Sequence, residues 1–207
     1  MKLSTIFSHL TFGELKQFGI GGYEDYKEIQ PDNYEEVVNH INLALLNLYT
    51  RFPILKKESV FPTEVDKTLY PLPEDCIRVN AVFCDGEEIP LNDEYAEASA
   101  IITSFNELLL PFATGSETIC VLYRAEPVPV TGTSLDEEVN LPDSLLEALL
   151  AYVEYRVRKS QGGQEGVQLA MAAKQTYEMM CVEIEKHNVF NSADASKNLK
   201  PELNGWV

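Results

Sequence analysis

The sequence lacks the short motifs by which many enzymes are recognised. It has no Gly-x-Ser-x-Gly nucleophile motif, and no Gly-rich loop that follows a strand and opens a helix, as phosphate binding requires. The four cysteines form no Cys-x-x-Cys pair, and His9, His40 and His187 have no second ligand at metal spacing. We therefore expect no catalytic residue, no cofactor, no metal ion and a non-enzymatic role.

Basic residues are also scarce. Lys and Arg together number 16, against 33 Asp and Glu, so the net charge at pH 7 is −17. Such a surface repels nucleic-acid phosphates, which argues against a conventional DNA- or RNA-binding protein. Solubility alone is enough to explain the charge, although like-charge repulsion also suits a wall past which DNA slides.

Long hydrophobic runs and a secretory leader are missing too. No apolar stretch approaches the roughly 20 residues that a membrane-spanning helix needs. The start of the sequence, Met1–Ser4, is not followed by the apolar core and cleavage site that a signal peptide has. The sequence predicts a protein made in the cytoplasm, without membrane contact, whose cysteines are buried, reduced thiols.

Several segments place apolar residues every three or four positions, the spacing of one helical face. This spacing predicts helices at Pro31–Phe52, Pro142–Gln161 and Gln164–Phe190, the last two forming an antiparallel hairpin. A shorter pattern covers residues 4–19, where we expect Thr11 to cap a second helical piece.

The middle of the chain is rich in β-branched and aromatic residues, separated by prolines and turn residues. Asp85-Gly86 predicts a hairpin turn, because both residues tolerate positive φ. The expected strands are Ser59–Phe61, Thr68–Tyr70, Cys76–Phe83, Glu88–Leu91, Glu107–Leu110 and Ile119–Arg124.

Together these patterns predict an α+β protein that is mainly an antiparallel helix bundle, built from residues 1–59 and 130–190. A small antiparallel β region, 60–129, is inserted into the bundle, and residues 191–207 form an extended, flexible C-terminal tail. The tail carries Trp206, the single tryptophan of the chain. Because tryptophan is a favoured interface anchor, Trp206 either docks into a neighbouring molecule or folds back onto the core.

Two acidic groups offer an enzymatic alternative. Asp85, Glu87 and Glu88 form one group, and residues 136–138 form the other. Paired carboxylates of this kind serve as acid and base in glycosidases. Both groups lie in turns, where acidic runs are usually solvated.

Five stretches of the sequence together resemble a known family. They are INLALLNLYTRFP, YPLPEDCIRVNAVFCDGEEIPLND, TICVLYRAEPVPV, VNLPDSLLEALLAYVEYRVRKSQGG and AAKQTYEMMCVEIEKHN. In this order, between Pro31 and Asn188, they are similar to the head-to-tail adaptor proteins of tailed double-stranded DNA bacteriophages. The likeness is greatest to the tail tubular protein A type of short-tailed phages.

The resemblance implies a structural virion protein at the head-to-tail junction. It implies a homo-oligomeric, dodecameric ring between the portal protein and the tail nozzle or other tail proteins. DNA would pass through the lumen during packaging and ejection, without sequence-specific binding. The tail would insert into the portal, with Leu199, Leu203, Trp206 and Val207 as candidate partner-binding residues.

Two other functions compete with this interpretation. One is a virion-associated cell-wall hydrolase that uses the paired carboxylates. The other is a generic cytoplasmic interaction module with no role in the virion.

Overall fold

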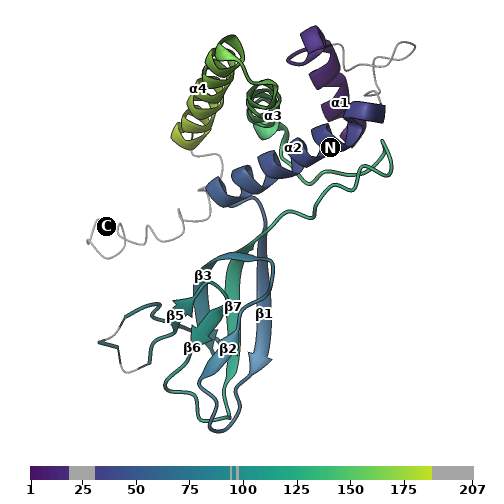
Figure 1. Cartoon of the computed structure of the whole chain (residues 1–207). Coiled ribbons are helices and arrows are strands. Elements are labelled where there is room, and N and C mark those ends of the chain that lie inside the picture. Colours follow the sequence, from purple (N-terminus) through teal and green to yellow (C-terminus); the bar gives the residue numbers. More distant parts are fainter. Residues whose placement is uncertain (19–30, 94, 97, 188–207) are drawn as a thin grey trace, which may run out of the picture. The chain divides into compact units, whose positions relative to one another are not determined.

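The computed structural model describes residues 1–18, 31–93, 95–96 and 98–187 (Figure 1). The chain divides into two units, each with its own core. The helical unit comprises Met1–Phe52 and Val128–Val207, and the β unit comprises Pro53–Pro127. The candidate partner-binding residues Leu199, Leu203, Trp206 and Val207 lie outside the described residues.

The helical unit is built from α1 (Leu3–Phe12), α2 (Pro31–Arg51), α3 (Leu146–Gln161) and α4 (Gln164–Lys186), with two short 3₁₀ turns, η1 (Lys16–Phe18) and η2 (Asp143–Leu145). The predicted helix at Pro31–Phe52 is confirmed as α2. Its expected apolar face is buried, because residues three and four apart share one side of a helix. Pro53 follows directly and has no N–H with which to continue the helix.

The end of α1 differs from the prediction. Thr11 lies inside the helix and does not cap a second piece: its hydroxyl donates to the carbonyl oxygens of Phe7 at 2.9 Å and Ser8 at 3.2 Å. A threonine hydroxyl within a helix commonly bonds the preceding turn in this way. The helix instead ends at Gly13, whose N–H donates to the carbonyl oxygen of His9 at 2.8 Å.

The predicted hairpin of α3 and α4 is confirmed, with η2 leading into α3. Gly162 and Gly163 connect the two helices with φ values of 68° and 75°. Glycine adopts this left-handed region without a steric penalty, so the chain reverses in almost no loop. In Figure 1, α3 lies between α1 and α4, which places these two helices at opposite edges of the helical unit.

The β unit contains two antiparallel sheets among its described residues. One has the strand order β1-β7-β3-β4 and the other β2-β6-β5. The strands are β1 (Lys56–Pro62), β2 (Leu69–Pro71), β3 (Cys76–Cys84), β4 (Glu87–Ile89), β5 (Ile101–Ser104), β6 (Glu107–Leu109) and β7 (Thr118–Ala125).

Every second side chain of β7 points into the core of the β unit, because side chains alternate along a strand. Both sheets contribute to this core. Tyr70 and Leu108 from one sheet join Val82 and Val121 from the other. The predicted Asp85-Gly86 turn is confirmed: it connects β3 to β4, with φ values of 50° and 90°.

The prediction of a fold that is mainly a helix bundle is wrong. The described residues form four α-helices and seven strands in two antiparallel sheets. The fold is therefore α+β, and the sheets are a major part of it. The physical reason is that the β strands bury a core of their own. The sequence suggests only a small insertion, because its β-type segments are short and separated by prolines and turn residues.

Candidate interaction surfaces

The outward face of α4 is unusually apolar. The helix packs on α3 through small or aromatic side chains, Ala170, Ala173, Tyr177 and Cys181, all buried. On the opposite side Met171 is 61% exposed and Met179 is 66% exposed. Val167 and Val182 are also exposed there. We call this surface the α4 edge; exposed apolar side chains gathered on one face are typical of a protein-binding surface.

A hollow of about 430 Å³ lies on the α4 edge. The described residues that line it come from α4: Met171, Lys174, Gln175, Glu178 and Met179. Methionine side chains are flexible and fill irregular gaps, so this face can adapt to a partner.

Polar contacts fix α4 against the end of α2. Arg51 donates from Nε to Glu185 at 2.7 Å and from Nη1 to Glu178 at 2.6 Å. These hydrogen bonds raise the pKa of the Arg51 guanidinium and lower the pKa of the Glu185 carboxyl. The Tyr177 hydroxyl donates to Asn47 of α2, and burial raises the pKa of that phenol. The orientation of the α4 edge is therefore set by α2 as well as by α3.

The opposite edge of the helical unit is formed by α1. Thr5, His9 and Phe12 occupy its exposed face at helical spacing, and Phe12 is 56% exposed. We call this surface the α1 edge. No Asp or Glu occurs before Glu14, whereas Lys2 and Lys16 are basic. The terminal amine donates to the carbonyl oxygen of Val139 at 2.8 Å, which ties the start of the chain to the segment before α3.

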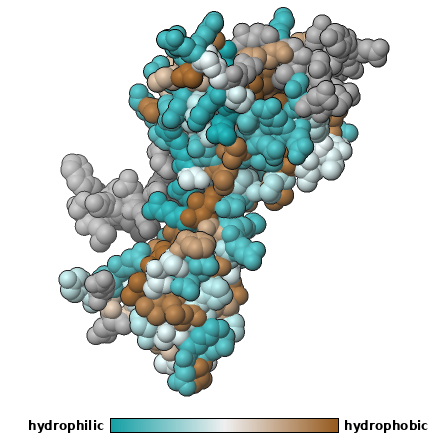
Figure 2. Space-filling model, viewed as in Figure 1, coloured by the Kyte–Doolittle hydropathy of each residue, from teal (hydrophilic) through white to brown (hydrophobic). Residues whose placement is uncertain are grey.

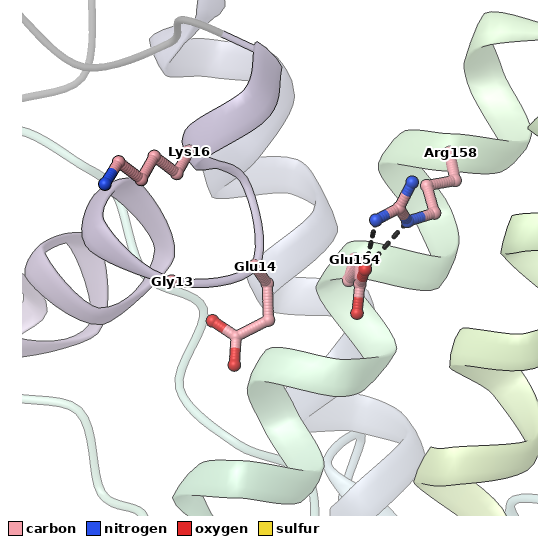
Figure 3. Close-up of a pocket in the computed structure, with 5 residues that line it drawn as sticks. All are labelled: Gly13, Glu14, Lys16, Glu154 and Arg158. Atoms are coloured by element: carbon pink, nitrogen blue, oxygen red, sulfur yellow. Dashed lines mark hydrogen bonds and ion pairs between the residues drawn. The ribbon is translucent and has the colours of Figure 1, made fainter.

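A second, open cavity of about 700 Å³ lies between the turn after α1 and the side of α3 (Figure 3). Arg158 and Glu154 line it and form an ion pair of 2.6 Å within α3. The guanidinium also lies 5.3 Å from the centre of the Phe18 ring. Glu14 extends between the two elements, and its buried Oε2 has no hydrogen-bond partner among the described residues. Its described lining mixes opposite charges, and none of these side chains is a serine, cysteine or threonine that could act as a nucleophile.

The two carboxylate groups of the hydrolase alternative lie in different units. Lys2 donates to Asp136 at 2.8 Å, and this bond lowers the pKa of the Asp136 carboxyl. Glu137 accepts from the backbone N–H groups of Thr131 and Gly132 at 2.8 and 2.9 Å, and its pKa is lowered as well. A glycosidase's general acid needs the opposite shift. Through these hydrogen bonds Asp136 and Glu137 stabilise the segment before α3.

The β unit exposes apolar side chains at its surface (Figure 2). Tyr95 is 97% exposed, Phe105 is 89% exposed and Val65 is 71% exposed, all in turns or loops. Glu117 organises the loop next to Val65: it accepts hydrogen bonds from the hydroxyls of Thr114 and Thr63, which lower its pKa. A loop held in this way presents its side chains at low entropic cost.

In the described ranges, no group of three or more His, Cys, Asp or Glu side chains is placed to hold a metal ion. None of the described helices is long and apolar enough to cross a bilayer. All four cysteines are free thiols; Cys181 is buried, whereas the other three are only partly buried.

A pH-dependent loss of stability is expected from His40 in α2. The residue is 8% exposed, and neither ring nitrogen has a hydrogen-bond partner within the described part of the chain. Glu36 Oε1 lies 3.4 Å from Nε2, and the charge of Arg156 also acts on the ring. Burial lowers the pKa of His40 despite Glu36. The imidazole of His40 therefore binds a proton more weakly in the folded state than in the unfolded state.

Acidification from pH 7.5 to 5.5 should accordingly lower the free energy of unfolding. The stability due to neutral His40 is present above its unfolded pKa of about 6.5 and is lost as the pH falls through the lowered value. Urea denaturation at several pH values measures how steeply the free energy of unfolding depends on pH, which is the slope compared below. His40→Leu should flatten it, and the exposed-site variant His9→Gln should keep it. An equal slope in wild type and His40→Leu would contradict the assignment.

Comparisons with known proteins identify one family. The family model described as SU10 adaptor protein matches residues 11–193, which cover the whole β unit and most of the helical unit. A search of curated proteins found no match.

Proposed function

Because the chain belongs to the SU10 adaptor protein family, we propose that it joins the head of a tailed phage to its tail. The family is one of phage structural adaptor proteins, so the chain is a virion component that associates with other virion proteins. Its specific partners are, in this proposal, the portal protein on one side and the tail nozzle or other tail proteins on the other.

The proposed assembly is a closed homo-oligomeric ring, dodecameric as in the tail tubular protein A type that the sequence resembles. DNA passes through the lumen during packaging and ejection. The net charge of −17 supports this proposal, because an acidic wall repels phosphates and lets DNA slide. The exposed apolar loops of the β unit supply a surface for tail components.

The proposed role is mechanical and needs no catalysis. The observation that carries it is the family match, which extends over most of the chain. The lowered pKa values of Asp136 and Glu137 give the hydrolase alternative no additional support.

Co-sedimentation with purified portal rings tests the proposal. The chain should sediment with its cognate portal and remain in the supernatant alone. A portal of an unrelated phage serves as the control for non-specific adhesion. Absence of co-sedimentation with the cognate portal over a wide concentration range would overturn the proposed function.

A further inference from the structure

We propose that, in the free chain, residues 188–207 dock onto the α4 edge of the same molecule, with Trp206 against Met171. We call residues 188–207 the C-terminal segment; it lies outside the described residues. The inference goes beyond the proposed function, because it concerns the chain before it meets the portal. It gives the exposed α4 edge a cover that the chain itself supplies.

The α4 edge is an apolar stripe that no other described residue covers. Met171 is 61% exposed, and Val167 and Val182 are exposed beside it, at spacings that share one helical face. The hollow of about 430 Å³ lies along this stripe and is large enough for an indole ring. An exposed apolar surface of this kind favours aggregation of a free chain, so a cover stabilises the unassembled state.

The C-terminal segment is tethered at a suitable distance from Met171. It follows α4 almost directly, since the helix ends at Lys186. Met171 lies about 22 Å back from Lys186 along the helix axis. A flexible chain as long as the one from Lys186 to Trp206 has an r.m.s. end-to-end distance of about 25 Å. A tether whose r.m.s. length matches the span gives the highest effective concentration, which favours docking within one molecule.

The side chains of the C-terminal segment suit this surface. Trp206 is the single tryptophan of the chain, and Leu199 and Leu203 precede it. A tryptophan ring buries a large area and is a favoured anchor. Methionine adapts its shape to a partner, and its sulfur makes favourable contacts with aromatic rings.

Charge also favours a cover from the same chain. The C-terminal segment has two basic and two acidic side chains, which are Lys197, Lys200, Asp194 and Glu202. Helix α4 carries two lysines and four glutamates, and Arg51 pairs with two of these glutamates, Glu178 and Glu185. Both surfaces are therefore close to neutral. Two whole copies, at −17 each, repel one another, which disfavours a second copy as the cover.

Fluorescence of the free, full-length chain tests the docking, because Trp206 is its single tryptophan. The emission maximum should lie at shorter wavelength than that of a synthetic peptide of residues 188–207. With the ring docked in about two thirds of the molecules, acrylamide should quench the chain about threefold less efficiently than the peptide. Neither difference should depend on protein concentration, because both partners belong to one molecule.

Two matched variants locate the site. Met171→Gln replaces the proposed contact by a polar side chain and should move both the emission and the quenching to the values of the peptide. Leu169→Gln removes an apolar side chain that is 43% exposed on nearly the opposite side of α4, and it should leave both unchanged. Glutamine has good helix propensity, so circular dichroism should show the same helix content in both variants.

Thiol labelling provides a measurement that does not use tryptophan. Gln175→Cys places a thiol in the hollow. This thiol should react with a maleimide about threefold faster in a chain truncated after Asn191 than in the full-length chain, because truncation removes the cover. Leu169→Cys should react at the same rate in both chains, and the wild type gives the background of the native cysteines.

The outcomes separate this inference from the proposed function. Peptide-like fluorescence of the full-length chain, a blue shift that survives Met171→Gln, or equal labelling of Gln175→Cys in both chains would overturn the docking. A blue shift that grows with concentration would place Trp206 on a second copy and would overturn it as well. None of these measurements uses the portal, so each of these results leaves the adaptor role intact. Failure to co-sediment with the portal would overturn the adaptor role and leave this docking standing.

Discussion

Replacing Tyr177 with alanine should lower the free energy of unfolding by about 3–5 kcal/mol, the usual cost of removing a large buried aromatic ring. Tyr177 is 2% exposed and connects three helices. Its ring lies edge-on to Tyr152 of α3 at 5.1 Å between centroids, and its hydroxyl donates to Asn47 of α2. The substitution leaves a cavity where α4 meets both neighbours, and partial collapse cannot fill it.

Matched variants separate the contribution of the Tyr177 ring to the free energy of unfolding from that of its hydroxyl. Tyr177→Phe keeps the packing and should cost about 1 kcal/mol, the usual net value of one hydrogen bond. Met179→Ala, at an exposed position of the same helix, should change stability by no more than about 0.5 kcal/mol. Urea denaturation gives all three values. A loss below about 1 kcal/mol for Tyr177→Ala would mean that α4 is not held as the structure indicates.

Truncation after Asn191 should abolish co-sedimentation with the portal and leave the fold intact. The described core ends with α4 at Lys186, so the contacts among the described residues are all kept. The deleted segment contains Leu199, Leu203, Trp206 and Val207. In our proposal this segment supplies the anchor that binds the portal, so its loss should be decisive for binding.

A point substitution sharpens this prediction. Trp206→Ala should weaken portal binding at least about thirtyfold, as expected of an interface anchor worth about 2 kcal/mol. Lys200→Ala, in the same segment, is the control and should bind almost normally. Normal portal docking by the truncated chain would rule out the tail as the anchor.

Local patterns in the sequence identified most of the elements. The spacing of apolar residues predicted α2 and the buried side of α3, because a helical face depends only on neighbours along the chain. In α4 the same spacing groups Val167 with the buried Ala170 and Ala173, yet Val167 is 48% exposed. A helix with apolar residues on two sides does not reveal which side meets its partner.

The balance between helix and sheet was harder to predict. Lys56 of β1 pairs with Arg124 of β7, a contact between distant residues that periodicity does not encode. Strand β5 was missed because Ile101–Ser104 is too short for alternation to be recognised, although Ile101, Ile102 and Thr103 are all β-branched. These non-local pairings create the separate β core and account for the error in fold class.

The interaction surfaces depend on information that the sequence lacks. Met171 and Met179 are exposed because the opposite side of α4 packs on α3 and hydrogen-bonds to Arg51 and Asn47 of α2. The ion pair between Lys2 and Asp136, which offsets a positive charge at the start of α1, is likewise not visible in the sequence, because it joins distant residues. The position of α1 opposite α4 becomes apparent only once both helices are placed against α3.

Electron microscopy of the chain assembled on its cognate portal tests the adaptor role most directly. The account predicts one closed ring of this chain stacked on the portal, with a continuous lumen for DNA and the same number of copies in every particle. A portal that carries no ring, while the chain stays monomeric beside it, would contradict the account.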